Sequence, residues 1–257
     1  MACKYPIILV HGLMIRHSRC HRAFGNIAPV LEDAGNVVYV STHDGFGSIE
    51  TNAEQIKSFV LTVLSKTNAQ KVNIIAHSKG GLDVKCALSD PDFSTRVASF
   101  TTLSTPHKGS ALASFIWRFP TFIKKPLAFF INAFYKMLGD KHPDAIKACY
   151  QLREEIACDN FSLPQGIYAQ SYSGKMKRAS DCFVMCIPNT VYKILKKAEN
   201  DGMVTPESAT FADYKGDFSK ESLSHAQIVD FMTPAKKKEK VFAFYKKLVL
   251  DLEEKGF

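Results

Sequence analysis

Short apolar runs alternate with stretches of helical periodicity along the first hundred residues. Nearly continuous apolar runs occupy residues 7–10, 37–40 and 72–76, and a further run begins at residue 97. Such runs are typical of strands that are buried on both faces of a parallel sheet. Between them, residues 24–34 and 56–63 carry apolar side chains at helical spacing. The alternation predicts an α/β fold with a mostly parallel sheet and right-handed crossover connections.

The pattern changes after residue 110. From about residue 111 to 150 the chain is rich in Phe, Ile and Leu and shows no strand pattern. Strand-like residues return at 166–172, and residues 241–253 have the spacing of a terminal helix. No internal repeat or linker divides the chain. We therefore expect a single domain over residues 1–257, with a helical lid or cap inserted at about 111–150.

The run at residues 72–76 leads into the sequence Ala-His-Ser-Lys-Gly at residues 76–80. A strand, a sharp turn with one serine among small residues, and a helix form the nucleophile elbow of α/β-hydrolases. Ala76 replaces the first glycine of the usual motif and is still small enough for the strand and helix to approach. Ser78 is therefore the candidate nucleophile.

A serine becomes reactive when a histidine accepts its proton and a carboxylate orients that histidine. In proteins with this elbow the chain order is serine, acid, histidine. His225 is the only histidine beyond residue 142, which makes it the candidate base. Asp201 is the preferred acid because Gly202 favours a tight turn that would aim its carboxylate. Three other acids remain alternatives: Asp181, Asp213 and Asp217.

The oxyanion of the reaction would be held by two backbone N–H groups. One belongs to Lys79, directly after the nucleophile, and the other to Leu13, after the first predicted strand. Met14 is the alternative to Leu13. Three further histidines are expected to support the loops by hydrogen bonds: His11, His77 and His107.

Five segments together resemble the bacterial triacylglycerol lipases of the α/β-hydrolase superfamily, especially the Gram-positive type with an Ala-His-Ser-x-Gly elbow. These segments, in chain order, are residues 5–13, 72–81, 104–110, 199–204 and 224–225. The resemblance implies a Ser78–Asp201–His225 triad and hydrolysis of carboxylic esters, most specifically of triacylglycerols. A short-chain esterase, a thioesterase or an acyltransferase with the same triad is the alternative. A non-catalytic lipid-binding protein of the same fold is the alternative from another class.

One position departs from the resembled lipases. Several of them bind a structural calcium ion through an aspartate two residues after the catalytic histidine, where this chain has Gln227. An amide is a poorer ligand for a hard cation than a carboxylate. We therefore expect no calcium, no other metal and no cofactor.

The insertion is the candidate lid. Pro126 and Gly139 predict the start and end of a helix with an apolar face. That face comprises Leu127, Phe130, Ile131, Phe134 and Leu138. The expected acyl-binding residues are Trp117, Phe130 and Phe134, and the face would also make transient contact with a lipid surface. An ordinary core helix remains the alternative.

Charge and cysteine content restrict the remaining possibilities. The net charge is +8, but basic and aromatic residues do not alternate along one element, so nucleic-acid binding is not expected. The predicted lid helix is shorter than the roughly 20 residues of a membrane span. The chain starts without a signal peptide, which predicts a cytoplasmic protein unless a leader has been removed. The odd number of cysteines, seven, favours free thiols, with a bridge among Cys149, Cys158, Cys182 and Cys186 left open.

Overall fold

The computed structural model describes residues 2–18, 22–156, 161–196 and 198–257. Its centre is a six-stranded sheet in the order β2-β1-β3-β4-β5-β6, in which every neighbouring pair is parallel. The strands span Ile7–Val10 (β1), Val38–Val40 (β2), Val72–His77 (β3), Val97–Leu103 (β4), Tyr168–Ser173 (β5) and Asp213–Asp217 (β6). The predicted α/β fold with a mostly parallel sheet is confirmed.

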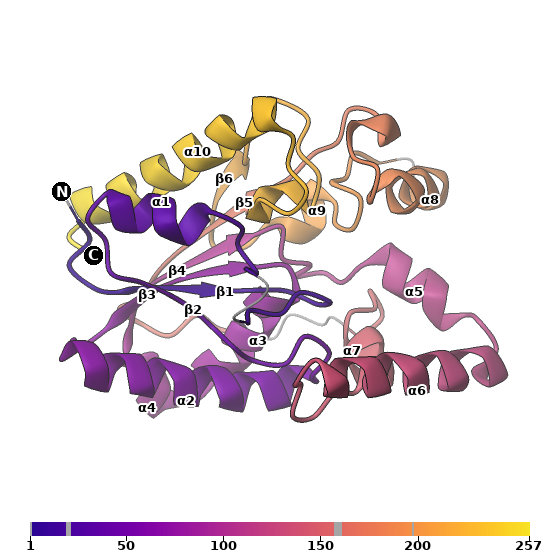
Figure 1. Cartoon of the computed structure of the whole chain (residues 1–257), viewed down its shortest axis with the longest axis horizontal. Coiled ribbons are helices and arrows are strands. Elements are labelled where there is room, and N and C mark those ends of the chain that lie inside the picture. Colours follow the sequence, from indigo (N-terminus) through magenta and orange to yellow (C-terminus); the bar gives the residue numbers. More distant parts are fainter. Residues whose placement is uncertain (1, 19–21, 157–160, 197) are drawn as a thin grey trace.

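Helices cover both faces of the sheet (Figure 1). Helices α1 (Ile27–Asp33) and α10 (Ala235–Glu254) pack on one face, whereas α2 (Ile49–Thr67), α3 (Lys79–Leu88) and α4 (Pro91–Ser94) lie on the other. Two short helical segments lie on either side of β6 in the sequence: α9 (Pro206–Ala209) before it and the 3-10 turn η2 (Gln227–Val229) after it. Each predicted strand can thus be apolar on both sides because each side is covered.

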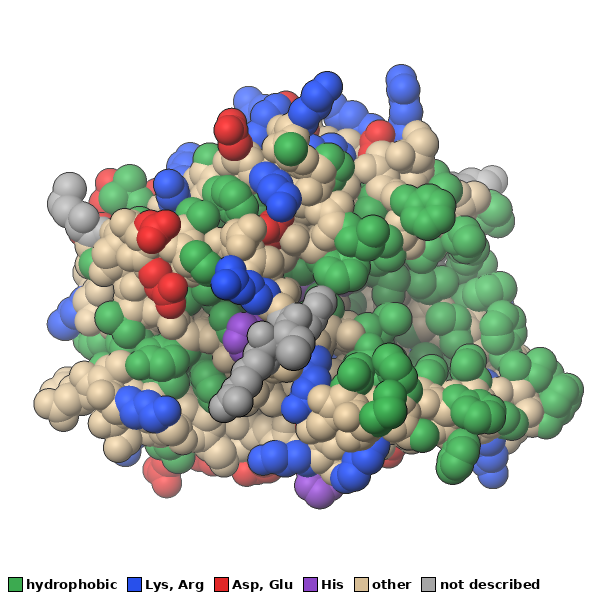
Figure 2. All heavy atoms as spheres, viewed as in Figure 1, with side chains coloured by type: hydrophobic (Ala, Val, Ile, Leu, Met, Phe, Trp, Pro, Cys, Tyr) green, Lys and Arg blue, Asp and Glu red, His purple; other side chains and the backbone are tan. Residues whose placement is uncertain are grey.

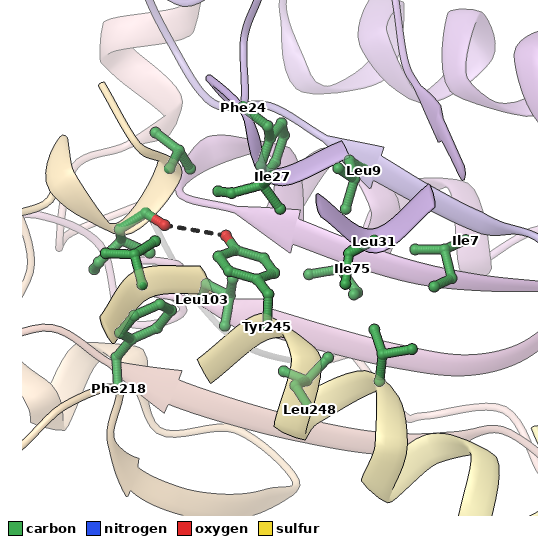
Figure 3. Close-up of a cluster of buried hydrophobic side chains, with 14 of the residues drawn as sticks. Ile7, Leu9, Phe24, Ile27, Leu31, Ile75, Leu103, Phe218, Tyr245 and Leu248 are labelled. Carbon is green, nitrogen blue, oxygen red and sulfur yellow. Dashed lines mark hydrogen bonds between the residues drawn. The ribbon is translucent and has the colours of Figure 1, made fainter. Parts of the chain in front are cut away.

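Alternate residues of β1 divide the core into two clusters. Ile7 and Leu9 join the cluster under α1 and α10, while Ile8 and Val10 join the cluster over α2 and α3. Figure 3 shows the first cluster, in which Tyr245 of α10 reaches between the strands and α1. Its buried hydroxyl donates to the carbonyl of Ile228 at 3.1 Å, so the polar group carries no desolvation penalty.

The predicted insertion contains three helices: α5 (Ala111–Trp117), α6 (Thr121–Met137) and α7 (Ala145–Gln151). Figure 1 shows α5 and α6 extending beyond the carboxyl end of the sheet. The prediction that Pro126 begins the central helix is wrong, since α6 begins five residues earlier and Pro126 lies inside it. Proline removes a helical N–H at that position, but the surrounding residues are exposed and water can satisfy the freed carbonyl.

Several elements outside the insertion were not predicted from the sequence. The short ones are α4, α9, η2 and the 3-10 turn η1 (Ala179–Asp181), and the longer ones are strand β6 and helix α8 (Cys186–Lys196). Strand β6 lies at the sheet edge and alternates exposed with half-buried residues, so it lacks the apolar run of a central strand. Helix α8 presents several apolar side chains to solvent, which hides the usual contrast between a core face and a polar face.

Candidate active site

Ser78 lies at the sharp turn between β3 and α3. Its backbone has φ 56° and ψ −133°, a conformation that few non-glycine residues adopt. The turn is possible because two neighbours lack side chains. A Cβ atom on Gly12 would lie 2.6 Å from Ser78 Cβ, and one on Gly80 would lie 2.3 Å from the His11 carbonyl oxygen. The first strand and the elbow can therefore approach closely enough to form one site.

Asp201 is fully buried in the turn that follows α8. Its Oδ1 accepts hydrogen bonds from the backbone N–H groups of Met203 (2.9 Å) and Val204 (2.8 Å). The Asp201 carbonyl also accepts from the His225 N–H at 2.8 Å. These contacts leave Oδ2 facing the His225 ring, with the carboxylate held in one orientation.

His225 connects the acid with the serine. Its Nδ1 lies 2.8 Å from Asp201 Oδ2, and its Nε2 lies 2.8 Å from Ser78 Oγ. A carboxylate at Nδ1 keeps the proton there, so that Nε2 can accept the serine proton. The structure thus brings together the three residues that were predicted from chain order.

The alternative acids lie elsewhere. Asp213 pairs with Lys215, Asp217 accepts from Ser173 Oγ at 2.7 Å, and Asp181 accepts from the backbone N–H of Arg178 at 2.9 Å. Of the carboxylates considered in the sequence, only Asp201 contacts His225 within the described residues.

The two predicted oxyanion donors, the N–H groups of Leu13 and Lys79, lie on either side of Ser78. The Lys79 N–H is at the first position of α3, where the helix offers it no acceptor. The Leu13 N–H has no hydrogen-bond partner among the described residues. In contrast, the Met14 N–H donates to the Gly45 carbonyl at 3.1 Å. Met14 is therefore excluded as the second donor, and Leu13 is retained.

The Lys79 side chain forms an ion pair that was not predicted. Its Nζ lies 2.6 Å from Asp83 Oδ1, one helical turn away, and both side chains are buried. Asn52 donates to the other oxygen of Asp83 at 3.0 Å. Burial raises the pKa of Asp83 to about 6, although the Lys79 charge opposes that shift. The i, i+4 spacing of the two residues in the sequence was the available signal.

Buried neutral histidines surround the site. Burial lowers the pKa of His11 to about 3 and holds the pKa of His43, His77 and His107 well below the ordinary value. His11 stacks on His43 with ring centroids 3.8 Å apart. His43 was not predicted as part of the site. Its Nδ1 lies 2.9 Å from Ser41 Oγ, and its Nε2 lies 3.1 Å from the His11 carbonyl oxygen.

The predicted supporting hydrogen bonds hold for two of the three histidines. His11 Nδ1 contacts the Gly12 carbonyl at 3.1 Å, and His107 Nε2 contacts Thr102 Oγ1 at 3.2 Å. His77 instead has no ring hydrogen bond to the described part of the chain. It packs against the His225 ring at a centroid distance of 4.5 Å, so it supports the base by van der Waals contact.

A cavity of about 740 Å³ opens beside Ser78 and His225. Its volume lies within the usual range of small-molecule sites, about 300–1,000 Å³. The insertion contributes apolar side chains to its wall, including Ile116, Tyr135 and Leu138. The cavity can therefore hold an apolar acyl chain with its carbonyl at the serine.

The three expected acyl-binding residues do not line this cavity. Phe130 and Phe134 are 68% and 50% exposed on α6, because the helix turns that face away from the site. Trp117 packs edge-on against Tyr150 and lies under Lys124 Nζ, 3.9 Å from the ring centroid. Of the predicted apolar face, Leu138 alone among these described residues reaches the cavity, where Ile116 of α5 and Tyr135 of α6 join it.

Gln227 is buried two residues after His225 in the sequence. Its amide nitrogen donates to the Asp181 carbonyl at 3.2 Å, and its oxygen accepts from Lys237 Nζ at 3.3 Å. No group of three or more His, Cys, Asp or Glu side chains in the described ranges has metal-binding geometry. Cys149, Cys182 and Cys186 are free thiols, and Cys158 lies outside the described residues.

Comparison with known proteins places these features among lipases and thioesterases. Residues 6–238 match the family model described as palmitoyl protein thioesterase. A triacylglycerol lipase of Pseudarthrobacter phenanthrenivorans is 36% identical over 152 residues, which cover 55% of this chain and 47% of the relative. Triacylglycerol lipase 2 of Saccharomyces cerevisiae is 28% identical over 258 residues, covering 88% of this chain and 72% of that protein. The chain spans less than half the length of the bacterial relatives that it matches.

Solved structures share the same fold. The Staphylococcus hyicus lipase aligns with a TM-score of 0.75 at 15% identity, covering 98% of this chain and 96% of that one. A metagenomic carboxyl esterase aligns with a TM-score of 0.76 at 19% identity, covering 98% and 76%. The α/β-hydrolase fold and the resemblance to bacterial lipases are thereby confirmed.

Proposed function

Because this chain belongs to the palmitoyl protein thioesterase family, we propose that it is a serine ester hydrolase of the lipase type, with triacylglycerols or related long-chain esters as substrates. One observation carries the proposal: Ser78, His225 and Asp201 form a continuous hydrogen-bonded series beside an apolar cavity. A series of this kind is the arrangement that activates a serine for acyl transfer.

The proposed reaction proceeds in two halves. His225 Nε2 removes the Ser78 proton while Oγ attacks the ester carbonyl, and the backbone N–H groups of Leu13 and Lys79 stabilise the oxyanion. His225 then protonates the leaving alcohol, which gives an acyl-enzyme. In the second half, His225 activates a water molecule that releases the fatty acid and restores Ser78.

Thioester hydrolysis is the second candidate activity. The family description, palmitoyl protein thioesterase, favours it. A thioester would form the same acyl-enzyme at Ser78 and differ only in its thiolate leaving group. The acyl part of either substrate would occupy the cavity between the insertion and His225.

We also propose that the open end of the cavity contacts a lipid surface. Exposed apolar residues of α6, of α8 and of the turn before α8 flank that end, among them Phe122, Phe130, Phe183 and Ile187. Figure 2 shows hydrophobic side chains gathered at the right-hand end of the molecule, where Figure 1 places these two helices. No described helix is long and apolar enough to cross a membrane. We propose that these exposed side chains make a transient contact with the lipid surface.

The activity is tested with nitrophenyl esters of rising acyl length, a long-chain triacylglycerol and an acyl thioester. Wild type should hydrolyse the long-chain esters, whereas Ser78→Ala should hydrolyse none. A serine-directed phosphonate should label Ser78 alone. Binding of acyl chains with no turnover of any of these substrates would favour the non-catalytic lipid-binding alternative.

The acid is tested with matched amide substitutions. Asp201→Asn should lower kcat by about 10⁴-fold, because His225 would lose its orienting carboxylate and adopt the wrong tautomer. Asp217→Asn is the control, since that carboxylate lies on the edge strand β6 and accepts from Ser173 Oγ of β5. A larger loss from Asp217→Asn than from Asp201→Asn would exclude the assignment.

A further inference from the structure

The loop that carries the Leu13 N–H contains a residue in an unfavourable backbone conformation. Met14 has φ 67°, in the left-handed region, although it is not a glycine. Such a conformation costs about 1–3 kcal/mol and persists only where surrounding contacts hold it. The contacts of Met14 therefore show what maintains the geometry next to the proposed oxyanion donor.

Both backbone polar groups of Met14 are held by other segments. Its N–H donates to the Gly45 carbonyl at 3.1 Å. Its carbonyl accepts from the Tyr135 hydroxyl at 2.6 Å, across 121 residues of sequence. Tyr135 belongs to α6, so a residue of the insertion holds the loop that follows β1.

The Tyr135 ring is closely packed where it makes this contact. A Cβ atom on Gly45 would lie 2.9 Å from Tyr135 Cε1, and Phe46 meets the ring edge-on with centroids 4.5 Å apart. Burial, followed by the charge of Asp140, raises the pKa of the Tyr135 hydroxyl above its ordinary value of 10. The hydroxyl is therefore protonated at neutral pH and acts as a donor.

A second contact ties the same helix to the same loop. Asp140, three residues beyond the end of α6, accepts from Arg16 Nη1 at 2.6 Å and from the Phe46 N–H at 3.0 Å. The residues just after α6 thus hold the loops at residues 13–16 and 44–46 together. Of these contacts, the Tyr135 hydroxyl can be removed without leaving a buried charge unpaired.

We propose that Tyr135 is a positioning residue for the reaction: its hydroxyl holds the Met14 carbonyl and thereby keeps the Leu13 N–H directed at the oxyanion. The proposal rests on the proposed ester hydrolysis at Ser78. The consequence is that a movement of α6 would also move the loop that carries the Leu13 N–H. A displacement of α6 from the 13–16 loop would weaken transition-state stabilisation as well as uncover the cavity.

The test is Tyr135→Phe, which keeps the ring that lines the cavity and removes only the hydroxyl. Loss of a whole oxyanion donor costs about 10²–10³ in kcat, so partial misplacement of one should cost about tenfold. The substrate is a nitrophenyl acetate ester, whose acyl group is too short to need the cavity wall. We expect kcat to fall about tenfold with KM changed less than twofold.

Tyr150→Phe is the matched control. Tyr150 is a tyrosine of the same insertion, it does not line the cavity, and its hydroxyl makes no hydrogen bond to the described residues. This variant should retain wild-type kcat. Equal losses in the two variants would mean that kcat responds to general loosening of the insertion, which would overturn the proposal.

Amide hydrogen exchange supplies a readout that does not depend on activity. The Met14 N–H should exchange faster in Tyr135→Phe than in wild type. Without the Tyr135 hydroxyl on the Met14 carbonyl, the hydrogen bond from the Met14 N–H to the Gly45 carbonyl should open more often. Unchanged exchange, or faster exchange with unchanged kcat, would overturn the positioning role. A rise in KM for long-chain esters alone would instead make Tyr135 an acyl-binding residue. If wild type hydrolyses no ester at all, the proposed function fails, whereas the exchange comparison still reports whether Tyr135 holds Met14.

Discussion

Single residues at this site adopt conformations that their surroundings must impose. Ser78 at φ 56° and Met14 at φ 67° are both outside the region that ordinary residues prefer. Ser78 is held because its N–H donates to the Leu103 carbonyl at 3.0 Å, and Gly12 leaves room beside it. Strain that is held in this way pre-organises the nucleophile and the loop beside it before substrate arrives.

Gln227 and Lys237 provide the first prediction at this scale. We expect activity and Tm to be independent of calcium, because the Lys237 ammonium already donates to the oxygens on either side of His225. It donates to the Ser222 carbonyl at 2.7 Å, before His225 in the sequence, and to Gln227 Oε1 at 3.3 Å, after it. A chelator should leave Tm unchanged. A drop in Tm that added calcium restores would show that other oxygen ligands bind the ion.

The same arrangement predicts the effect of removing the lysine. Lys237→Met should destabilise the fold by about 2 kcal/mol, since hydrogen bonds from a charged donor are lost. For a chain of this size that corresponds to a fall in Tm of about 4–8 °C. Lys236→Met is the control because that side chain is exposed. Equal effects of the two substitutions in a thermal melt would contradict the assigned role of Lys237.

At the scale of elements, α6 has two faces with different tasks. Tyr135 in the helix and Leu138 just after it line the cavity. Phe130 and Phe134 are exposed to solvent. A helix that is apolar on its solvent side is unusual in a soluble domain unless it meets another apolar surface. The exposed face of α6 is therefore the element most directly expected to contact lipid.

This face gives the element-scale prediction. Phe130→Asp and Phe134→Asp should reduce vesicle binding and hydrolysis of a dispersed long-chain ester by tenfold or more, since burying one Phe contributes about 1.5–3 kcal/mol. Rates with a dissolved acetate ester should not change. Thr121→Asp adds the same charge at the first residue of α6, about two and a half turns before Phe130, and should be neutral. Equal losses on both substrates would mean that the face supports the fold rather than lipid contact.

Fluorescence of the single tryptophan gives an independent measurement. Trp117 is half-buried in α5 between Lys124 and the Arg153 guanidinium. Its emission should shift when detergent micelles are added to wild type and shift less for Phe130→Asp. An unchanged spectrum with wild type would indicate that the insertion does not respond to an apolar surface.

At the scale of the whole molecule, the parallel sheet brings the groups that we propose to react to one edge. Ser78 follows β3, Leu13 lies in the loop after β1, and His225 lies in a loop beyond β6. Loops at the carboxyl ends of parallel strands meet at this edge, which is where ligands bind in open α/β sheets. The same edge buries four neutral histidines, so the stability of the molecule depends on pH.

The histidines predict acid sensitivity. His11, His43, His77 and His107 have lowered pKa values in the fold, while in the unfolded chain they titrate near 6.5. Below pH 6.5 the unfolded state therefore binds more protons, and stability falls as pH falls. The four residues together should cost about 5 kcal/mol between pH 7 and pH 5.5. Protonation of Asp83, whose pKa is raised to about 6, offsets about 1 kcal/mol of this loss.

Urea unfolding at several pH values measures this effect. The free energy of unfolding should fall with a slope equivalent to about three protons per molecule below pH 6, the four histidines less the proton that Asp83 binds in the fold. A slope of less than one proton would mean that these histidines are protonated in the folded state. Since the predicted loss is a large part of ordinary domain stability, about 5–15 kcal/mol, the protein should unfold in mild acid.

The sequence by itself was sufficient for the central strands, the elbow and the expectation that Ser78, Asp201 and His225 meet. The reason is that these features are local or ordered along the chain. A buried parallel strand must be apolar, a sharp turn needs small residues, and His225 is the only histidine beyond residue 142. None of these inferences required knowledge of which distant segments pack together.

Only the tertiary structure decided which side chains face the cavity and what supports the oxyanion loop. The periodicity of α6 placed Phe130 and Phe134 on an apolar face, but it could not show that this face is exposed and that Tyr135 turns toward Met14. The direction of a helix face depends on packing against residues 44–46, far away in the sequence. His43 and the edge strand β6 could not be predicted for the same reason. Their roles depend on residues that the fold brings next to them, His11 and strand β5, and not on their own sequence pattern.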